Sequence, residues 1–277
     1  MKILLLGKNG MLAQAILSVF KGKHEIIATS HSECDITKPE DILAWVDSVS
    51  PKMVINATGY TKVDLAEKEK DLAYKVNAEG VGNIARILSD KNIPLIHFST
   101  DYVFNGENQD GYYEDATYSP LSTYGASKAE GEKEIIKNMK KYFIVRTSWL
   151  YGPGGSNFVD TMLNLARKKE NIRVVCDQTG CPTYTFDLAQ AILKLSDGDK
   201  YGIYHLTNDG STTWFDFAVE IFNQLGIPMH ITKITTAERN SSAPRPKYSI
   251  LMNSKFPRLR YWKEGLTAFL SNKTLIL

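Results

Sequence analysis

The stretch Ile3-Leu4-Leu5-Leu6-Gly7-Lys8-Asn9-Gly10-Met11-Leu12-Ala13 begins as a short apolar run and continues into a helical pattern. A glycine turn between a strand and a helix is the context that a dinucleotide-binding fingerprint requires. Gly7 permits the tight turn, Gly10 lets backbone N–H groups approach a pyrophosphate, and Ala13 allows close packing of helix on strand. The spacing is G-x-x-G-x-x-A rather than G-x-G-x-x-G. Taken alone it is a weak signal, because small residues are common at such turns.

Short apolar runs alternate with amphipathic helical patterns through the first half of the chain. Strands joined by helices of this length form right-handed crossovers in a parallel sheet. One of the helices should begin at Pro39 with Thr37 as its N-cap. The expected strands are Ile3–Leu6, Glu25–Thr29, Met53–Asn56, Leu95–Phe98 and Phe143–Thr147, and the expected helices are Met11–Phe20, Pro39–Val49, Leu72–Lys91 and Thr123–Lys140.

The regular alternation weakens after Tyr151-Gly152-Pro153-Gly154-Gly155. The sequence therefore predicts an α/β fold, with a Rossmann-type doubly wound parallel sheet in residues 1–150. Residues 151–277 should form mainly a smaller, irregular α/β substrate-binding lobe, with or without elements that return to the sheet. Its expected elements are the strands Arg173–Cys176 and Tyr204–Leu206 and the helices Phe186–Leu195 and Phe215–Leu225.

The overall composition excludes several classes of protein. With 33 basic and 31 acidic residues among 277, the net charge of +2 provides no field for capturing nucleic acid or an anionic membrane. No apolar run reaches the ~18 residues that span a bilayer. Cys34, Cys176 and Cys181 form no metal-ligand pair and fit reduced thiols. We therefore expect a globular protein of the cytoplasm, without nucleic-acid or membrane partners.

Residues near the ends of the second and third strands complete the expected cofactor site. Asp35 could accept a hydrogen bond from adenine, and Ala57-Thr58-Gly59 would let the cofactor lie against the sheet edge. The second strand ends near Ser30 without the carboxylate that binds a ribose 2′-hydroxyl, which favours NADPH and leaves NADH as the alternative. The predicted cofactor-binding residues are Gly7, Asn9, Gly10, Met11, Leu12, Ser30, Asp35, Ile36, Ala57, Thr58, Gly59, Tyr60, Phe98, Tyr124 and Lys128.

Tyr124 and Lys128 lie four residues apart at the start of a predicted helix, hence on one face. A free phenol titrates near ~10, and a nearby ammonium makes it a better acid toward a developing alkoxide. Thr100, at the end of the fourth strand, could hydrogen-bond the same substrate oxygen. Such a Tyr/Lys pair is common on surface helices. Its position after a glycine-turn unit and a strand-end Ser-Thr makes it the predicted catalytic set.

The sequence resembles the dTDP-4-dehydrorhamnose reductase family of the extended short-chain dehydrogenase/reductase superfamily. The resemblance covers nearly the whole chain. The glycine turn and the Tyr/Lys pair indicate only the superfamily, whereas three blocks are more specific. These are Ser99-Thr100-Asp101-Tyr102-Val103-Phe104, Arg146-Thr147-Ser148-Trp149 and Asp177-Gln178-Thr179-Gly180-Cys181-Pro182-Thr183, with Asn157-Phe158 and Arg245-Pro246 in addition.

The resemblance implies a proton donor in Tyr124, its modulator in Lys128 and a partner hydroxyl in Thr100. It also implies substrate contacts for Thr100, Asp101, Trp149, Asn157 and Gln178. Two of these have structural alternatives, since Trp149 could belong to the core and Asn157 could cap a helix that starts near Phe158.

Two departures from the family pattern affect what we expect. Thr58 stands where alanine is usual, so it could crowd or hydrogen-bond the cofactor. The first helix reads Leu12-Ala13-Gln14-Ala15-Ile16, without the carboxylate that some members use in a Mg²⁺-bridged dimer. We therefore expect no metal, and monomer and homodimer both remain open.

The implied reaction is NAD(P)H-dependent reduction of the C4 carbonyl of dTDP-4-dehydro-β-L-rhamnose to dTDP-L-rhamnose. One alternative is reduction of another nucleotide-linked 4-keto-6-deoxysugar. The other is a non-catalytic nucleotide-binding regulatory subunit of the same fold, against which the intact Thr100, Tyr124 and Lys128 set argues.

Overall fold

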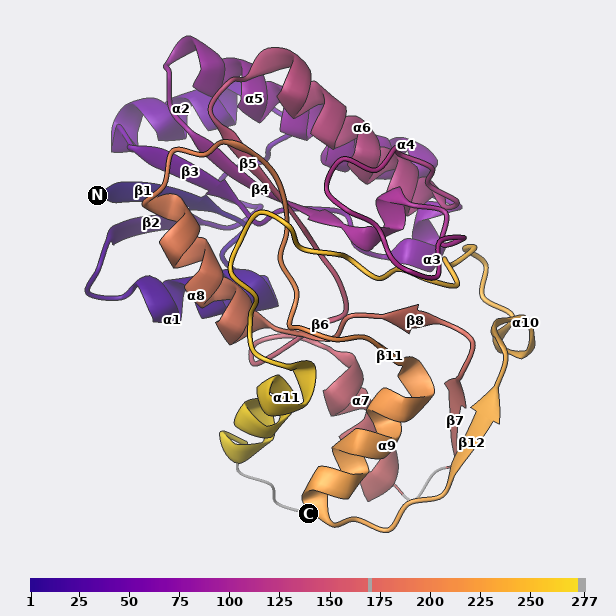
Figure 1. The fold of residues 1–277 in the computed structure, drawn as a ribbon. Coiled ribbons are helices and arrows are strands. Elements are labelled where there is room, and N and C mark those ends of the chain that lie inside the picture. Colours follow the sequence, from indigo (N-terminus) through magenta and orange to yellow (C-terminus); the bar gives the residue numbers. More distant parts are fainter. Residues whose placement is uncertain (169–170, 274–277) are drawn as a thin grey trace.

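A computed structural model describes residues 1–168 and 171–273, and a six-stranded parallel sheet lies at the centre of the larger lobe (Figure 1). Its strand order is β10-β5-β4-β3-β1-β2, so the chain moves outward in opposite directions from β1. The predicted Rossmann-type sheet is confirmed. Its strands are β1 (Lys2–Leu6), β2 (Glu25–Thr29), β3 (Met53–Asn56), β4 (Leu95–Thr100), β5 (Tyr142–Thr147) and β10 (Gly202–His205).

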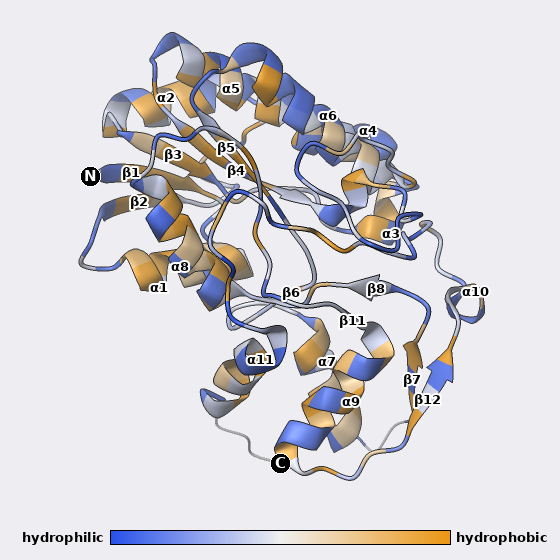
Figure 2. Ribbon diagram, in the orientation of Figure 1, coloured by the Kyte–Doolittle hydropathy of each residue, from blue (hydrophilic) through white to orange (hydrophobic). Residues whose placement is uncertain are grey.

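The strands of the sheet are mainly apolar, and helices cover both of its faces (Figure 2). In β1, Ile3 and Leu5 belong to one core cluster, and Leu4 and Leu6 to the other. The first face is covered by α1 (Met11–Phe20) and α8 (Thr185–Ser196), and the second by α2 (Pro39–Val49), α5 (Gly80–Asp90) and α6 (Thr123–Asn138).

The helix predicted over Leu72–Lys91 is not a single α-helix. It begins as α4 (Lys70–Tyr74), widens into the π-helical turn η1 (Lys75–Glu79) and continues as α5. The wider turn rotates α4 about the helix axis relative to α5. Leu72 on α4 is therefore 45% exposed and does not continue the buried stripe of α5. A short helix, α3 (Val63–Ala66), precedes α4.

The predicted N-cap of α2 is wrong by one residue. Lys38 holds that position, and no side chain caps the helix. The Thr37 hydroxyl and backbone N–H instead donate to Oδ1 of Asp35, at 2.9 and 3.0 Å. This local turn competes with capping, because the acceptor that Thr37 finds lies before the helix.

The second lobe has its own apolar core, formed around Tyr151, Phe217 and Phe269. A parallel pair, β7 with β12, lies at one side of it. The elements of this lobe are β6 (Leu150–Tyr151), α7 (Phe158–Arg167), β7 (Ile172–Val175), β8 (Thr179–Gly180), β9 (Thr183–Tyr184), β11 (Thr212–Thr213), α9 (Trp214–Leu225), β12 (Ile231–Ile234), α10 (Thr236–Arg239) and α11 (Trp262–Ser271).

Residues 185–205 return from this lobe to the sheet. Helix α8 buries Leu188 and Ile192 in the same cluster as Ile16 of α1. Strand β10 then pairs in parallel with β5, matching Tyr204 to Val145. A boundary at residue 150 therefore does not divide the chain into two continuous units.

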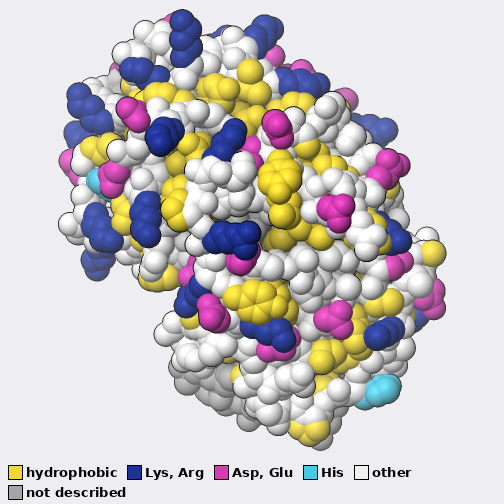
Figure 3. All heavy atoms as spheres, in the orientation of Figure 1, with side chains coloured by type: hydrophobic (Ala, Val, Ile, Leu, Met, Phe, Trp, Pro, Cys, Tyr) yellow, Lys and Arg dark blue, Asp and Glu magenta, His cyan; other side chains and the backbone are white. Residues whose placement is uncertain are grey.

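The surface carries charges of both signs. Lys and Arg side chains are interspersed with Asp and Glu on the face shown in Figure 3, as expected from the near balance of 33 basic and 31 acidic residues. In residues 1–168 and 171–273, no helix has the length and apolar character needed to cross a membrane.

Candidate active site

The turn after β1 requires glycine at its first position. Gly7 has φ +92°, and a Cβ there would lie 3.0 Å from the backbone of Ala57 and from Cγ2 of Thr58. Gly10 is the N-cap of α1 and provides no side-chain cap. The first-turn N–H groups of a helix have no partner within it, so this end of α1 can bind a phosphate group.

A cavity of about 520 Å³ adjoins this turn, at the carboxyl ends of β1, β2 and β3. A dinucleotide fits the residues present, because glycine and uncapped amides occupy the place where a pyrophosphate would bind. The predicted cofactor residues that line the cavity are Gly7, Asn9, Gly10, Ser30, Asp35, Ile36, Ala57, Thr58, Gly59 and Tyr60.

Five other predicted cofactor residues lie outside this lining, and two of them, Tyr124 and Lys128, belong to the catalytic set described below. Leu12 is buried in the core beneath α1. Met11 begins α1, and its sulfur accepts a long 3.9 Å hydrogen bond from Asn157. The Phe98 side chain is buried, while its carbonyl accepts from Lys128. Cofactor contacts by these residues stay predictions.

The end of β2 does hold a carboxylate, contrary to the sequence argument. The turn after the strand brings Glu33 back, where its Oε2 accepts from Ser30 N at 2.6 Å and Ser30 Oγ at 2.7 Å. Lys8 donates to Oε1 of the same group at 2.8 Å. The hydrogen bond from Lys8, together with those from Ser30, lowers the pKa of Glu33 to about 2. The reason given above for favouring NADPH therefore does not hold, since this end of β2 carries an anion and a cation together.

Replacing Glu33 with glutamine should lower the KM for NADPH relative to that for NADH. The change removes a negative charge that repels a 2′-phosphate and leaves Lys8 free to attract it. We expect a shift in the KM ratio of about two- to fivefold, the range typical of one solvent-screened charge. Glu25→Gln, at the opposite end of β2, is the matched control. An unchanged ratio in the Glu33 variant would show that Glu33 does not face the ribose.

Helix α6 brings the predicted catalytic residues to the carboxyl end of β4. Ser122 caps it, and the Ser122 hydroxyl accepts from Gly125 N at 3.2 Å. A Cβ on Gly125 would overlap the carbonyl oxygen of Tyr102, so glycine is needed for this close approach. The Tyr124 ring lies edge-on to that of Tyr102, with ring centres 5.7 Å apart.

Tyr124 is a phenol that stays protonated at neutral pH. Burial raises its pKa to about 12, while a hydrogen bond with Thr100 lowers it and the charge of Asp101 raises it. The sequence argument expected Lys128 to lower the pKa of Tyr124, but burial is the largest effect and raises that pKa. A protonated phenol is the form that a proton donor needs.

Lys128 is only 5% exposed and lies beneath this cluster. Its Nζ donates to the Phe98 carbonyl at 2.5 Å and lies 3.4 Å from Nε2 of His97. Burial lowers the pKa of Lys128 to about 8, against an opposing effect of Glu132. This lysine can therefore change its charge close to neutral pH.

Thr100 and Asp101 form the other side of the cluster. Thr100 Oγ1 donates to Oδ1 of Asp101 at 2.9 Å, and the other carboxylate oxygen of Asp101 is buried without a hydrogen-bond partner. Burial raises the pKa of Asp101 to about 6, against the lowering effect of the neighbouring Ser249 and Thr100 side chains. An unpaired buried oxygen of this kind is ready to accept a hydrogen bond from a hydroxyl group.

A second cavity, of about 380 Å³, lies on the side of the smaller lobe. Tyr102 lines it and also packs against Tyr124, which joins this cavity to the catalytic cluster. Its lining includes Gln178 and Trp214 and three arginines, Arg173, Arg239 and Arg245. Arg245 is held by Asp64 through contacts of 2.7 and 3.0 Å, whereas Arg173 and Arg239 are exposed.

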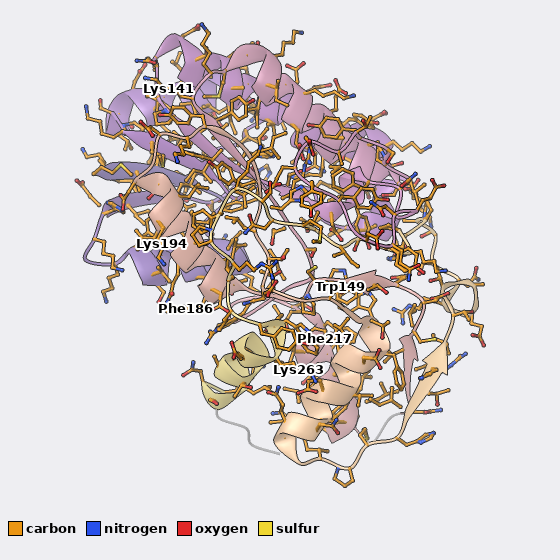
Figure 4. The ribbon with its side chains drawn as sticks, in the orientation of Figure 1. Lys141, Trp149, Phe186, Lys194, Phe217 and Lys263 are labelled. Atoms are coloured by element: carbon orange, nitrogen blue, oxygen red, sulfur yellow. The ribbon has the colours of Figure 1, made fainter. Side chains whose placement is uncertain are left out.

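Trp149 and Asn157 have structural roles in this arrangement. Trp149 has φ +49° and stacks on Trp214, with ring centres 3.5 Å apart, on the sheet side of Phe217 (Figure 4). Asn157 is the N-cap of α7, where its Oδ1 accepts from Asp160 N at 3.0 Å. Its Nδ2 donates to the Gly152 carbonyl at 3.0 Å. The capping alternative for Asn157 is therefore present in the structure, and substrate contacts by both residues stay predictions.

Gln178 lines the second cavity but is only 5% exposed. Its Nε2 donates to Thr236 Oγ1 at 3.0 Å, and Asp177 accepts from the backbone and side chain of the same threonine. The loop of Gln178 is thus anchored to α10. The amide still has further bonding capacity for a ligand.

A family model described as RmlD substrate binding domain matches residues 1–275 of the chain. The chain belongs to this family. It is 40% identical to the dTDP-4-dehydrorhamnose reductase of Aggregatibacter actinomycetemcomitans, over 90% of either chain. It is 39% identical to the spore coat polysaccharide biosynthesis protein SpsK of Bacillus subtilis, over 99% of this chain and 98% of that protein. Among solved structures, dTDP-4-dehydrorhamnose reductase from Bacillus anthracis in complex with NADP is 40% identical, with a TM-score of 0.96 over 98% of this chain and 99% of that one.

Several residues that line the two cavities are not among the predicted site residues. The cofactor cavity is also lined by His31, Cys34, Thr37, Leu72, Lys75 and Val76. Arg173 and Arg239 meet in the second cavity only because β7 pairs with β12, just before α10. Isolated arginines so far apart in the chain carry no pattern that could predict their meeting.

The part of the chain that the structure describes contains no group of three or more His, Cys, Asp or Glu side chains placed to hold a metal ion.

Proposed function

We propose that this protein reduces the C4 carbonyl of dTDP-4-dehydro-β-L-rhamnose with NADPH, forming dTDP-L-rhamnose. One observation carries the proposal: the Thr100, Tyr124 and Lys128 cluster adjoins both cavities. Gly59 lines the first cavity, and a Cβ there would lie 3.9 Å from Nζ of Lys128. Tyr102 lines the second and contacts Tyr124. The names of the relatives and their near-complete overlap with this chain support the same reaction.

The residues of the chain divide the chemistry among them. When bound, the reduced nicotinamide supplies a hydride to the carbonyl carbon. Tyr124 donates its phenolic proton to the oxygen that becomes a hydroxyl, and Thr100 hydrogen-bonds the same oxygen. Lys128 lies beneath the cluster, and in its ammonium form its charge favours release of the phenolic proton.

The second cavity suits the nucleotide end of the substrate. A nucleotide-linked sugar carries a diphosphate, and arginine guanidinium groups bind phosphate oxygens in paired hydrogen bonds. Arg173 and Arg239 are exposed at this cavity, and Arg245 is held in place by Asp64. The sugar would then extend past Tyr102 toward Tyr124.

The proposal includes a cytoplasmic location, which the cysteines support. Cys34, Cys176 and Cys181 are all free in the structure, the state that thiols keep in a reducing compartment.

Consumption of NADPH by the purified protein tests the reaction, with a panel of 4-keto-6-deoxy sugar nucleotides that differ in base and sugar. We expect the highest kcat/KM for dTDP-4-dehydro-β-L-rhamnose. A higher value for another member of the panel would show a reductase of a different sugar nucleotide. Binding of NADPH without turnover of any member would show the non-catalytic alternative.

Replacing Arg239 with glutamine should raise the KM for the sugar nucleotide about tenfold, the cost typical of one charged hydrogen bond. The KM for NADPH should not change, because Arg239 lines only the second cavity. Steady-state kinetics with each substrate varied in turn provide the measurement. Arg86→Gln, which alters an exposed arginine on α5, is the matched control. Equal KM values for the sugar nucleotide in the two variants would remove Arg239 from the site.

A further inference from the structure

A buried chain of polar groups connects the cofactor cavity to Lys128. Asn56 and His97 are each 0% exposed, and Asn56, the last residue of β3, pairs in register with His97 in the middle of the neighbouring strand β4. Asn56 Nδ2 lies 3.1 Å from Nδ1 of His97, and Nε2 of His97 lies 3.4 Å from Nζ of Lys128. His97 is part of neither the predicted cofactor site nor the predicted catalytic set.

The orientation of the Asn56 amide is fixed from the cavity side. Thr58 donates twice to Oδ1 of Asn56, from its backbone N–H at 3.1 Å and from its hydroxyl at 2.6 Å. A backbone N–H can only donate, so the atom it meets must be the oxygen. The Asn56 amide nitrogen therefore faces His97.

This orientation fixes the tautomer of His97. An amide nitrogen can only donate, so Nδ1 of His97 must accept and cannot carry a hydrogen. Burial, together with the charge of Lys128, holds the pKa of His97 well below its usual 6.5, so the ring is neutral. A neutral ring whose Nδ1 is bare carries its hydrogen on Nε2, the atom that faces Lys128.

A hydrogen on Nε2 has unequal effects on the two states of Lys128. The uncharged amine has a lone pair that can accept this hydrogen. The ammonium has three hydrogens and no acceptor, so it would place donor against donor. The Phe98 carbonyl accepts from Lys128 in either state.

We propose that His97 is a positioning residue that presents its Nε2–H to Lys128 and so favours the uncharged amine, in an orientation set by Thr58 through Asn56. The inference rests on the proposed function, because it assumes that Lys128 has a catalytic role. A lysine that gains and loses its proton near neutral pH can take part in the proton exchange that restores the Tyr124 phenol, whereas a permanently charged lysine cannot.

The other groups near Lys128 do not produce the same effect. On α6 these are Tyr124, which is neutral, and Glu132, whose charge favours the ammonium. Glu132 is in turn paired with Arg146 of β5, at 2.8 Å. On β4 the facing titratable group is His97. Asn56 at the end of β3, and Thr58 and Gly59 after it, carry no charge.

The tautomer can be measured directly by nitrogen NMR on protein labelled at histidine, with and without NADP⁺. We expect the His97 signals, identified by their loss in His97→Gln, to show a protonated Nε2 and a bare Nδ1. Protonation of Nδ1 in the wild-type protein would overturn the proposal. This readout needs no turnover, so it stands even if the assigned reaction fails, and the sugar-nucleotide assay tests that reaction separately.

Two variants then test the effect of His97 on the titration midpoint of Lys128. The midpoint is measured by carbon NMR of labelled lysine and from the basic limb of the profile of kcat against pH. In Asn56→Asp, one carboxylate oxygen can still accept from Thr58, and the other accepts from Nδ1 of His97. The hydrogen of the His97 ring should therefore move from Nε2 to Nδ1. We expect the midpoint of Lys128 to rise by about one pH unit or more. His97→Gln adds no charge and can turn its oxygen toward the ammonium, so its midpoint should also rise.

The pair of variants separates the tautomer from simple charge. If only Asn56→Asp raises the Lys128 midpoint, the added carboxylate accounts for the effect and the proposal is wrong. A rise in both variants, with melting temperatures near that of the wild type, supports it. If either variant fails to fold, the tautomer of the wild-type protein decides alone.

Discussion

Replacement of Tyr124 with phenylalanine is expected to lower kcat by ~10²-fold or more, the usual size of a lost general-acid contribution. The ring and its edge-on contact with Tyr102 remain, so the protein should still fold and bind NADPH. Only the phenolic proton is lost, together with the hydrogen bond to Thr100. Single-turnover oxidation of bound NADPH measures the chemical step, and the melting temperature reports on folding.

Tyr113→Phe is the matched control for this experiment. Tyr113 is 50% exposed and lies outside both cavities, so the same change there should leave kcat unaltered. A folded Tyr124→Phe protein that keeps near-normal kcat would remove Tyr124 from the role of proton donor.

The second large effect concerns stability rather than catalysis. Arg146 and Glu132 form an ion pair that is almost fully buried, with side-chain exposures of 1% and 0%. Arg146 donates three hydrogen bonds to this carboxylate, at 2.8 to 3.1 Å, and its guanidinium lies over the rings of Phe104 and Tyr118. The arginine of the Arg-Thr-Ser-Trp block therefore holds β5 to α6 and does not face a ligand cavity.

Replacing Glu132 with glutamine should lower the free energy of unfolding by about 3–5 kcal/mol, because Arg146 would remain buried without a counter-charge. For a chain of this size we expect the melting temperature to fall by roughly 10 °C. Urea titration and a thermal scan measure the two quantities. Glu130→Gln, which removes an exposed charge from the same helix, should change the free energy of unfolding by less than about 1 kcal/mol. Equal stability of the two variants would contradict the role given to the buried pair.

The sequence predicted those features that depend on neighbouring residues. The strands, the glycine turn at Gly7 and the start of α6 follow from local pattern, and each lies within two residues of its expected place. The four-residue spacing of Tyr124 and Lys128 was enough to place them on one helix. Their approach to Thr100 followed from the rule that parallel strands meet ligands at their carboxyl ends.

The features that were missed depend on how the chain folds back on itself. Glu33 reaches Ser30 through a turn whose direction no local pattern showed, so the carboxylate at the end of β2 was overlooked. The π-helical turn η1 leaves Leu72 at the cofactor cavity, although its spacing fits a buried stripe. The arginine cavity and the contact of Lys128 with His97 join residues far apart in the sequence.

The return of residues 185–205 to the sheet has a consequence for synthesis of the protein. A ribosome makes β1 through β5 first, yet the face that carries α1 is not complete until α8 has emerged. The apolar side chains that later pack on Leu188 and Ile192 stay open to solvent while much of the smaller lobe is translated. Nascent chains fold from the N-terminus, but one face of this sheet stays uncovered until α8 has been synthesised. The half-covered sheet is therefore the species that a chaperone would bind.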